Sequence, residues 1–338
     1  MTSTERRRPT TEVASAPADD PSPSATAVDA PRSADLDFAP RTIPCAGGRS
    51  VTIRAMDGLD VDGLDDLYRR LDSEDRYCRF FSAGVLARPS IERIASIGAR
   101  GGFGVVAVEG DDPSVRLPIL AEATFAPLPD GDAELAITVE RRWRGWLGPY
   151  LMDLLFEVAA QRGVPNLEAE ILATNRRMLA VARSRGYVMC DHDGWSTLRL
   201  LMGAVSPDPV WPAGAGRPRV LVESPGGRWH GEDALREAGA SVLVCPGPAR
   251  RGRSCPAMCG RTCALAAGAD LIIMGLPVDE PHRPALLDAH RELHGETPVH
   301  ITRRDDAADG PTPARGRGSE VVDAALDALA ALDPTATS

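Results

Sequence analysis

The segment of this chain with the clearest potential for chemistry is RRWRGWLGP, residues 141–149, where a predicted strand runs into a predicted helix. Glycines allow a backbone to approach a ligand closely, and arginines and the N–H groups of a helix N-terminus bind phosphate. Pro149 suits the first helical turn, where its missing N–H would have no partner. The segment predicts either a phosphate cradle or an ordinary turn with exposed arginines. The candidate binding residues are Arg142, Arg144, Gly145, Trp146, Leu147, Gly148 and Pro149.

Four of the seven cysteines lie close together in the last third of the chain, at Cys245, Cys255, Cys259 and Cys263. Tetrahedral thiolate sites bind zinc or iron–sulfur clusters, most often with Cys-x2-Cys pairs, whereas these spacings are nine, three and three residues. The group therefore predicts a metal or cluster site, a set of reactive thiols, or simple packing. His290 and His294 lie four residues apart on a predicted helix, for which we expect a solvated face.

The elements that would position these residues alternate between strand and helix patterns over residues 46–205. Apolar runs bounded by turn residues predict strands, and apolar residues at intervals of three and four predict helices. The predicted strands cover residues 51–56, 101–110, 117–127, 132–140, 166–172 and 196–202. The predicted helices cover residues 64–71, 73–81, 151–159 and 175–185, with caps at Ser73 and Gly186. The pattern predicts an α/β fold with a mixed sheet and flanking helices.

This order of motifs resembles the GNAT N-acetyltransferase superfamily. The segment NLEAEILATNRRMLAVARSRGY, residues 166–187, is similar to the family region in which a strand is followed by an Asn, a short helix and a Gly–aromatic pair. LYRRLDSEDRYCRFF, residues 67–81, resembles the first-helix segment of a subgroup that includes bacterial protein lysine acetyltransferases. The resemblance covers about residues 46–205, just under half of the chain.

Two positions depart from the family pattern. The family loop Gln/Arg-x-x-Gly-x-Gly/Ala is matched by Arg142 and Gly145, but Leu147 stands at the last small position and Gly148 is displaced by one residue. Ala182 stands where many members carry a Tyr that acts as general acid toward the departing thiolate. A thiolate whose pKa is about 8–9 leaves tolerably well without that help.

The resemblance also implies roles for acidic side chains. Glu134 is similar to the strand glutamate that acts as general base in the lysine-acetylating subgroup, and a base is needed because only a neutral amine attacks. Glu168 and Glu170 on the neighbouring predicted strand are alternative bases. For Glu168 and Glu170 alternating polar exposure along the strand is the simpler interpretation, whereas for Glu134 a solvated strand-edge carboxylate is the alternative to the role of base.

The same resemblance places acetyl-CoA along the fourth strand of the family order. The backbone of Ile137, Thr138 and Val139 would hold the acetyl carbonyl and the pantetheine arm, and amides around the Gly loop would hold the pyrophosphate. Asn175 is expected either to bind the pantetheine arm or to cap the helix that follows it. Trp146 and the neighbouring Trp143 are equally explained by core packing.

Residues 219–302 carry a second alternation of short strands and helices, which predicts a small doubly wound α/β domain of a family that we do not recognise. The Pro- and Gly-rich stretch 206–218 predicts an interdomain linker. Residues 303–318 predict a second linker, followed by a terminal helix at 319–333 that packs on the second domain. Residues 1–45 are rich in Ser, Thr, Pro, Ala and Asp and predict disorder.

Composition narrows the function classes. The net charge of −10 argues against nucleic-acid binding, because phosphate backbones favour a basic surface. The sequence contains no lysine, so no lysine can serve as a Schiff-base nucleophile. No stretch approaches the roughly 20 apolar residues that cross a membrane, and no signal peptide is predicted. We therefore expect a cytoplasmic protein without membrane partners or structural disulfides.

Together these observations predict an acyl-CoA-dependent N-acetyltransferase with a C-terminal module that regulates or recruits. Acetyl-CoA would be the co-substrate, and a protein lysine or a small amine would be the acceptor. The alternative is a sensor or interaction protein, in which a GNAT scaffold without turnover is coupled to a metal or redox module built from the cysteines. The sequence determines neither the acceptor nor the oligomeric state.

Overall fold

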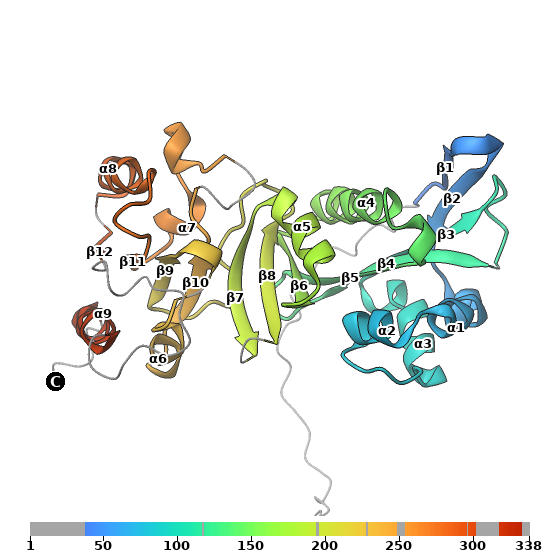
Figure 1. Cartoon of the computed structure of the whole chain (residues 1–338), viewed down its shortest axis with the longest axis horizontal. Coiled ribbons are helices and arrows are strands. Elements are labelled where there is room, and N and C mark those ends of the chain that lie inside the picture. The colour runs from blue at the N-terminus through green and yellow to red at the C-terminus, as the bar shows by residue number, and fades with distance from the viewer. Residues whose placement is uncertain are drawn as a thin grey trace, which may run out of the picture. The chain divides into compact units, whose positions relative to one another are not determined.

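A computed structural model of the chain describes residues 38–116, 118–193, 196–227, 229–248, 254–295, 297–301 and 318–332 (Figure 1). Residues 1–37 of the segment predicted as disordered, and nearly all of the predicted linker 303–318, lie outside these residues. The end of the first segment is described, and there Arg41–Pro44 form a strand, β1, that pairs with β2 at Ser50–Ala55.

The twelve described strands form one mixed sheet, in the order β1-β2-β3-β4-β5-β6-β8-β7-β10-β9-β11-β12. The first five strands form an antiparallel meander, whereas β5 and β6 run parallel and are joined through a helix, as parallel neighbours require. The remaining strands of this half are β3 (Phe103–Glu109), β4 (Ile119–Pro127), β5 (Ala133–Val139), β6 (Asn166–Leu172), β7 (Tyr187–Asp193) and β8 (Thr197–Gly203).

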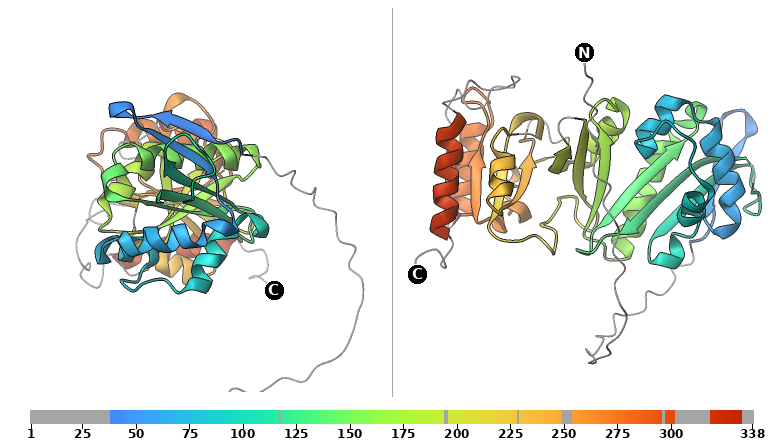
Figure 2. Two further views of the ribbon diagram at one scale, coloured as in Figure 1. Left: turned by 90° about the vertical axis from the view of Figure 1, so that its right-hand side faces the viewer. Right: turned by 90° about the horizontal axis from the view of Figure 1, so that it is seen from below.

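Helices cover both faces of these strands (Figures 1 and 2). On one face lie α1 (Val61–Arg70), α2 (Ser73–Phe80) and α3 (Arg88–Ala95), and on the other lie α4 (Leu147–Gln161) and α5 (Arg176–Arg185). The buried side of α4 includes Leu151, Leu154, Leu155 and Val158, the helical spacing that the sequence shows. Each such side chain contributes roughly 1.5–3 kcal/mol by leaving water.

The C-terminal strands are parallel and continue the same sheet, because Val244 of β10 pairs with Met189 of β7. They are β9 (Arg219–Glu223), β10 (Ser241–Cys245), β11 (Leu271–Met274) and β12 (Val299–Ile301). Their helices are α6 (Glu232–Glu237), α7 (Ala264–Ala267), α8 (Arg283–Leu293) and α9 (Gly318–Leu332), with α6 and α9 on one face and α7 and α8 on the other (Figure 1). The mixed α/β class is thus confirmed, while a separate second domain stays a prediction.

Several local predictions change in detail. The cap of α2 is Asp72, whose side chain accepts from the Asp75 N–H at 2.8 Å, and Ser73 is already helical. The elements β1, α3, β7 and α7 were not predicted. Gly186 ends α5 with a φ of 74°, as its prediction as a cap requires. None of the described helices is long and apolar enough to cross a membrane.

Candidate active site

The candidate site is a cleft of about 540 Å³ that opens where β5 and β6 part. The two strands pair only at Ala133↔Leu167 and Glu134↔Glu168, and no further register pair joins them within the described residues. Beyond that point β5 stays paired with β4, and β6 stays paired with β8. The two strands therefore diverge, although each remains hydrogen-bonded to its other neighbour. The volume of the cleft between them is typical of a small-molecule site.

The backbone of β5 presents hydrogen-bonding groups to this cleft. The Glu140 N–H donates to the Leu120 carbonyl on β4, so alternation along the antiparallel pair directs the backbone groups of Thr138 toward β4 as well. The intervening residues, Ile137 and Val139, direct their N–H and C=O groups toward the side from which β6 has parted, where the Val139 carbonyl already accepts from the Arg144 Nε. Because backbone groups away from water require partners, this edge suits a bound amide chain. All three predicted residues of β5 line the cleft.

The start of α4 forms one end of the cleft. Trp146 is the N-cap residue and makes no side-chain cap hydrogen bond, so the first N–H groups of the helix are left for another acceptor. Gly148 and Pro149 line the cleft at this end. The Leu147 side chain is fully buried in the core that α4 shares with the sheet. The leucine at the family's small-residue position therefore packs inward and does not enter the cleft.

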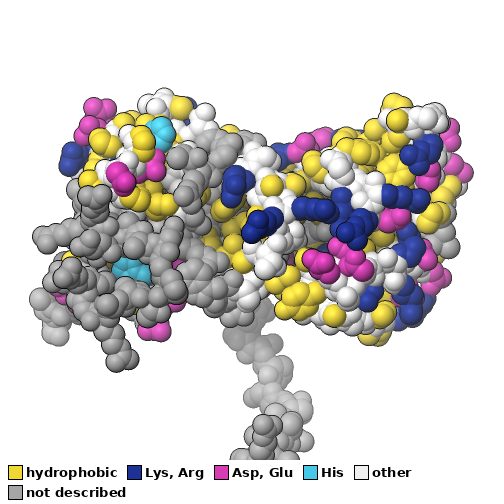
Figure 3. Space-filling view, in the orientation of Figure 1, with side chains coloured by type: hydrophobic (Ala, Val, Ile, Leu, Met, Phe, Trp, Pro, Cys, Tyr) yellow, Lys and Arg dark blue, Asp and Glu magenta, His cyan; other side chains and the backbone are white. Residues whose placement is uncertain are grey.

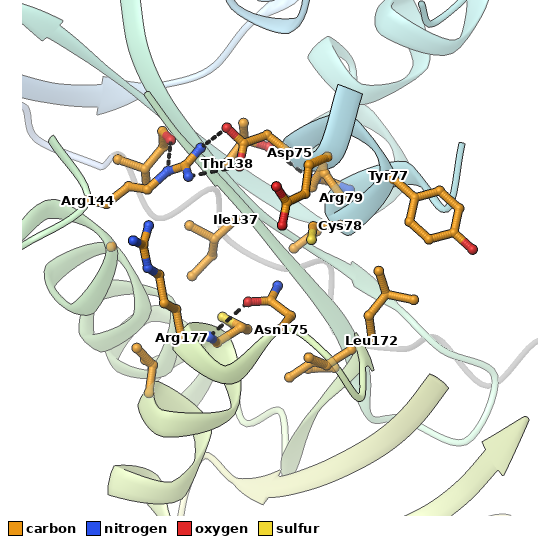
Figure 4. A pocket seen from close by; sticks show the side chains of 18 of the residues that line it. Asp75, Tyr77, Cys78, Arg79, Ile137, Thr138, Arg144, Leu172, Asn175 and Arg177 are labelled. Carbon is orange, nitrogen blue, oxygen red and sulfur yellow. Dashed lines mark hydrogen bonds and ion pairs between the residues drawn. The ribbon is translucent and has the colours of Figure 1, made fainter. Parts of the chain in front are cut away.

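The Arg144 side chain lines the same end and is held by two neighbours. Its Nε donates to the Val139 carbonyl at 2.9 Å, and its guanidinium contacts the carboxylate of Asp75 on α2 at 2.6 Å (Figure 4). Arg141 similarly lies 3.4 Å from Asp72. These pairs fasten the loop between β5 and α4 to α2, and they leave little of Arg144 for a ligand.

Arg176 and Arg177 on α5 supply further positive charge at this end. Both are exposed and line the cleft, and neither forms an ion pair with any residue that the structure describes. Figure 4 shows Arg177 extending from α5 toward the Arg144 end of the cleft. In Figure 3 arginine side chains gather over α4 and α5, beside an acidic patch over α2. We did not predict Arg177 as a binding residue, although its position two residues after Asn175, at the start of a predicted helix, could have indicated that role.

Not all predicted loop residues face the cleft. Arg142 and Trp146 line a separate hollow of about 390 Å³, formed with the end of β1 and the residues after it, and Gly145 lines neither space. Trp143 is 4% exposed and packs in the core, with its ring centroid 6.3 Å from that of Trp146. Packing thus accounts for both tryptophans.

Carboxylates gather at the closed end of the cleft, where β5 and β6 still pair. Glu134 and Glu170 are exposed and line the cleft, whereas Glu168 is nine-tenths buried. Burial, helped by the nearby acidic groups and opposed by Arg199, raises the pKa of Glu168 to about 7. A carboxyl group with a pKa near 7 exchanges protons readily at neutral pH. Of the three predicted bases, Glu134 and Glu170 reach the cleft itself.

A buried ionic network supports the wall opposite α4. Arg79 of α2 donates to Glu122 of β4 at 2.9 Å and to the Thr138 hydroxyl at 3.0 Å, and Thr138 donates to Glu122 at 2.8 Å. Glu122 is fully buried, and burial together with this carboxylate raises the pKa of the neighbouring Tyr68 phenol. The network ties α2 to the middle of β5. The lone Glu in the apolar run ILAEATFAP was the signal for it.

Asn175 caps α5, because its Oδ1 accepts from the Met178 N–H at 3.2 Å. Asn175 also lines the cleft, but its side-chain oxygen is already used for the cap. Of the two expected roles, capping is the one that the structure shows.

The cysteines and histidines of the C-terminal half separate into different environments. Cys245 and Cys263 belong to one apolar cluster, Cys255 packs against another, and Cys259 is exposed. Among the residues that the structure describes, the four sulfurs do not form a group close enough to share a metal ion. The solvated face expected for His290 and His294 is wrong: both are buried, and the His290 Nε2 lies 3.0 Å from Glu223.

No family model matches the chain, and no curated protein matches it. Solved structures do. They include the GNAT domain of S. lividans PAT (21% identity, TM-score 0.42, covering 48% of this chain and 96% of that one). Another is a GNAT superfamily phosphinothricin acetyltransferase from Sinorhizobium meliloti in complex with AcCoA (17% identity, TM-score 0.38, covering 50% of this chain and 96% of that one). A third is a cAMP-binding acyltransferase from Mycobacterium smegmatis (25% identity, TM-score 0.33, covering 49% of this chain and 47% of that one). The S. lividans and S. meliloti proteins are described as GNAT proteins, and each likeness covers about half of this chain.

Proposed function

We propose that the chain is an acetyl-CoA-dependent N-acetyltransferase in which an amine attacks the thioester directly. The observation that supports it most is the parting of β5 and β6 between a cationic end and a carboxylate end of one cleft. The open edge of β5 suits the amide-bearing pantetheine arm. The start of α4 and Arg177 suit a pyrophosphate, because helix N-termini and guanidinium groups both bind phosphate oxygens.

The closed end supplies the proton chemistry. A neutral amine forms the new nitrogen–carbon bond as the carbon–sulfur bond breaks, and Glu134 accepts the proton that the nitrogen loses. Ala182 is buried and offers no acid, so the departing thiolate leaves with its charge and takes a proton from solvent. Among the described residues that line the cleft, Tyr77 carries the one phenol, and it is 48% exposed.

Calorimetric titration with acetyl-CoA, followed by thiol release with a panel of amines, tests this proposal. Binding with a micromolar dissociation constant is expected, and Glu134→Gln should lower kcat about 10²–10⁴-fold because the base is lost, while the dissociation constant for acetyl-CoA stays within about twofold. Glu92→Gln on α3, an exposed glutamate that does not line the cleft, is the matched control. Absence of binding at millimolar acetyl-CoA would contradict the proposal.

A further inference from the structure

A second hollow, of about 260 Å³, continues from the closed end of the cleft. Glu134 and Glu170 line both spaces, so an acceptor seated at Glu134 has this hollow as its natural extension. The remaining walls are formed by Leu128, Pro129, Asp130, Glu168 and Arg199. The hollow therefore combines a short apolar wall with several carboxylates.

Among the residues that the structure describes, Glu168 is the one carboxylate of this hollow with a positive partner, the long contact to Arg199. Glu134 and Glu168 stand directly opposite each other in the last pair of β5 and β6, an arrangement that costs stability when both are charged. Glu168 is nine-tenths buried and accepts no hydrogen bond from a described residue, and its nearest cation, the half-exposed Arg199, is 3.9 Å away. A buried carboxylate facing an acidic hollow is stabilised by an incoming cation.

Resting on the acetyltransferase function proposed above, we propose that this hollow binds a second ammonium group of the acceptor. The preferred acceptor is then an alkyl diamine or polyamine. One nitrogen lies at Glu134 for acetylation, the methylene chain lies along Leu128 and Pro129, and the other nitrogen lies beside Asp130 and Glu168.

The surroundings favour an ammonium group over a metal ion. Oxygens of Asp130, Asp132 and Glu168 lie within 4.8 Å of one another, as a metal would need. Both oxygens of Asp132, however, already accept from the Asn166 amide at 3.0 Å in a buried contact. Calcium and magnesium prefer six or more oxygen ligands, which the apolar wall of Leu128 and Pro129 does not offer, whereas that wall matches methylene groups.

The titration of Glu168 gives the proposal a pH dependence. Its pKa of about 7 results from burial and the acidic side chains of Asp130, Asp132 and Glu134, opposed by Arg199 of β8. The pKa of the nearby Cys190 thiol on β7 is raised by burial and, to a smaller extent, by the charge of Glu168. Below pH 7 the carboxyl group is protonated and attracts a cation weakly. Affinity for a dication therefore rises as pH increases from 6 to 8, and binding near neutrality releases a proton.

The test compares 1,4-diaminobutane with n-butylamine, which has the same carbon chain and one charge fewer. Titrations of the full chain, with and without CoA, should give a dissociation constant at least tenfold lower for the diamine. Asp130→Asn and Glu168→Gln should each reduce that advantage to about threefold or less. The control is Asp111→Asn, which removes the same charge from an exposed residue outside the cleft and the hollow and should preserve the full ratio.

Each outcome decides the proposal. The proposal is overturned if the two amines bind with equal affinity, if neither binds, or if the diamine keeps its full advantage in both variants. It is also overturned if Mg²⁺ binds at this hollow with micromolar affinity, or if a lysine peptide is acetylated as well as the diamine. Selective diamine binding without acetylation of any amine upholds the hollow and contradicts the acetyltransferase function. Equal acetylation of monoamine and diamine upholds the function and contradicts the hollow.

Discussion

At the scale of single residues, the cleft separates charged groups that are already paired from groups that remain available. Arg79 and Arg144 are bound to buried or half-buried carboxylates and hold α2 against β5. Arg177 and Glu134 carry no ion pair with a described residue and line opposite ends of the same space. The paired side chains hold helices and strands in place, whereas the available ones can bind ligands. Substitutions at the first kind of residue should therefore change mainly stability, and substitutions at the second mainly binding or activity.

We expect Arg177→Ala to weaken acetyl-CoA binding by about 10–100-fold, because a hydrogen bond to a charged group contributes about 1.5–3 kcal/mol. Arg183→Ala is the matched control, since Arg183 is an exposed arginine of the same helix that does not line the cleft. Calorimetry at two salt concentrations checks both variants. An equal loss of affinity in the two would mean that general charge, and not a contact at Arg177, attracts the phosphates.

At the scale of elements, local sequence patterns were enough to predict most of the strands and helices in the first half of the fold. The six predicted strands and the helices α1, α2, α4 and α5 follow from apolar spacing and Gly or Pro boundaries. The element α3 was missed although Ile91 and Ala95 are buried one helical turn apart, because the segment is short and has a proline in its first turn. Local patterns are sufficient where each element buries one face.

The parting of β5 and β6 could not be predicted in the same way. It depends on β6 pairing with β8, which lies across a helix and a strand in the sequence, while β5 keeps β4. The inward packing of Leu147 and the separate hollow at Arg142 also arise from three-dimensional contacts. Sequence spacing identified which loop lies at the site, but not which of its side chains face the cleft.

The cap of α5 gives a prediction at the element scale. Asn175→Ala should lower the free energy of unfolding by about 1 kcal/mol, because the Met178 N–H loses its acceptor. Asn175→Ser should recover most of that loss, since serine caps nearly as well. Urea denaturation measures both. If Asn175→Ala instead weakens acetyl-CoA binding more than tenfold at unchanged stability, the side chain serves the ligand and not the helix.

At the scale of the whole molecule, the described residues share cores across the predicted linker. The largest apolar cluster joins Leu155 and Met189 with Val220 and Val244, and a second cluster joins Val188 and Leu201 with Leu221. The Pro- and Gly-rich composition of residues 206–218 marks a change of architecture, from mixed to parallel strands. Composition alone cannot tell whether the two sides of such a stretch bury surface against each other.

A core substitution in the C-terminal half therefore tests how far the two halves unfold together. Leu221 is 1% exposed, and Leu221→Ala should lower the free energy of unfolding by about 2–5 kcal/mol. Because Leu221 packs with Val188 and Leu201, the loss should also appear in hydrogen exchange of the α4 amides, which lie in the other half. The matched variant Leu155→Ala in α4 should likewise reduce protection in β9. Loss of protection confined to the mutated half in both variants would mean that residues 219–302 unfold as an independent domain.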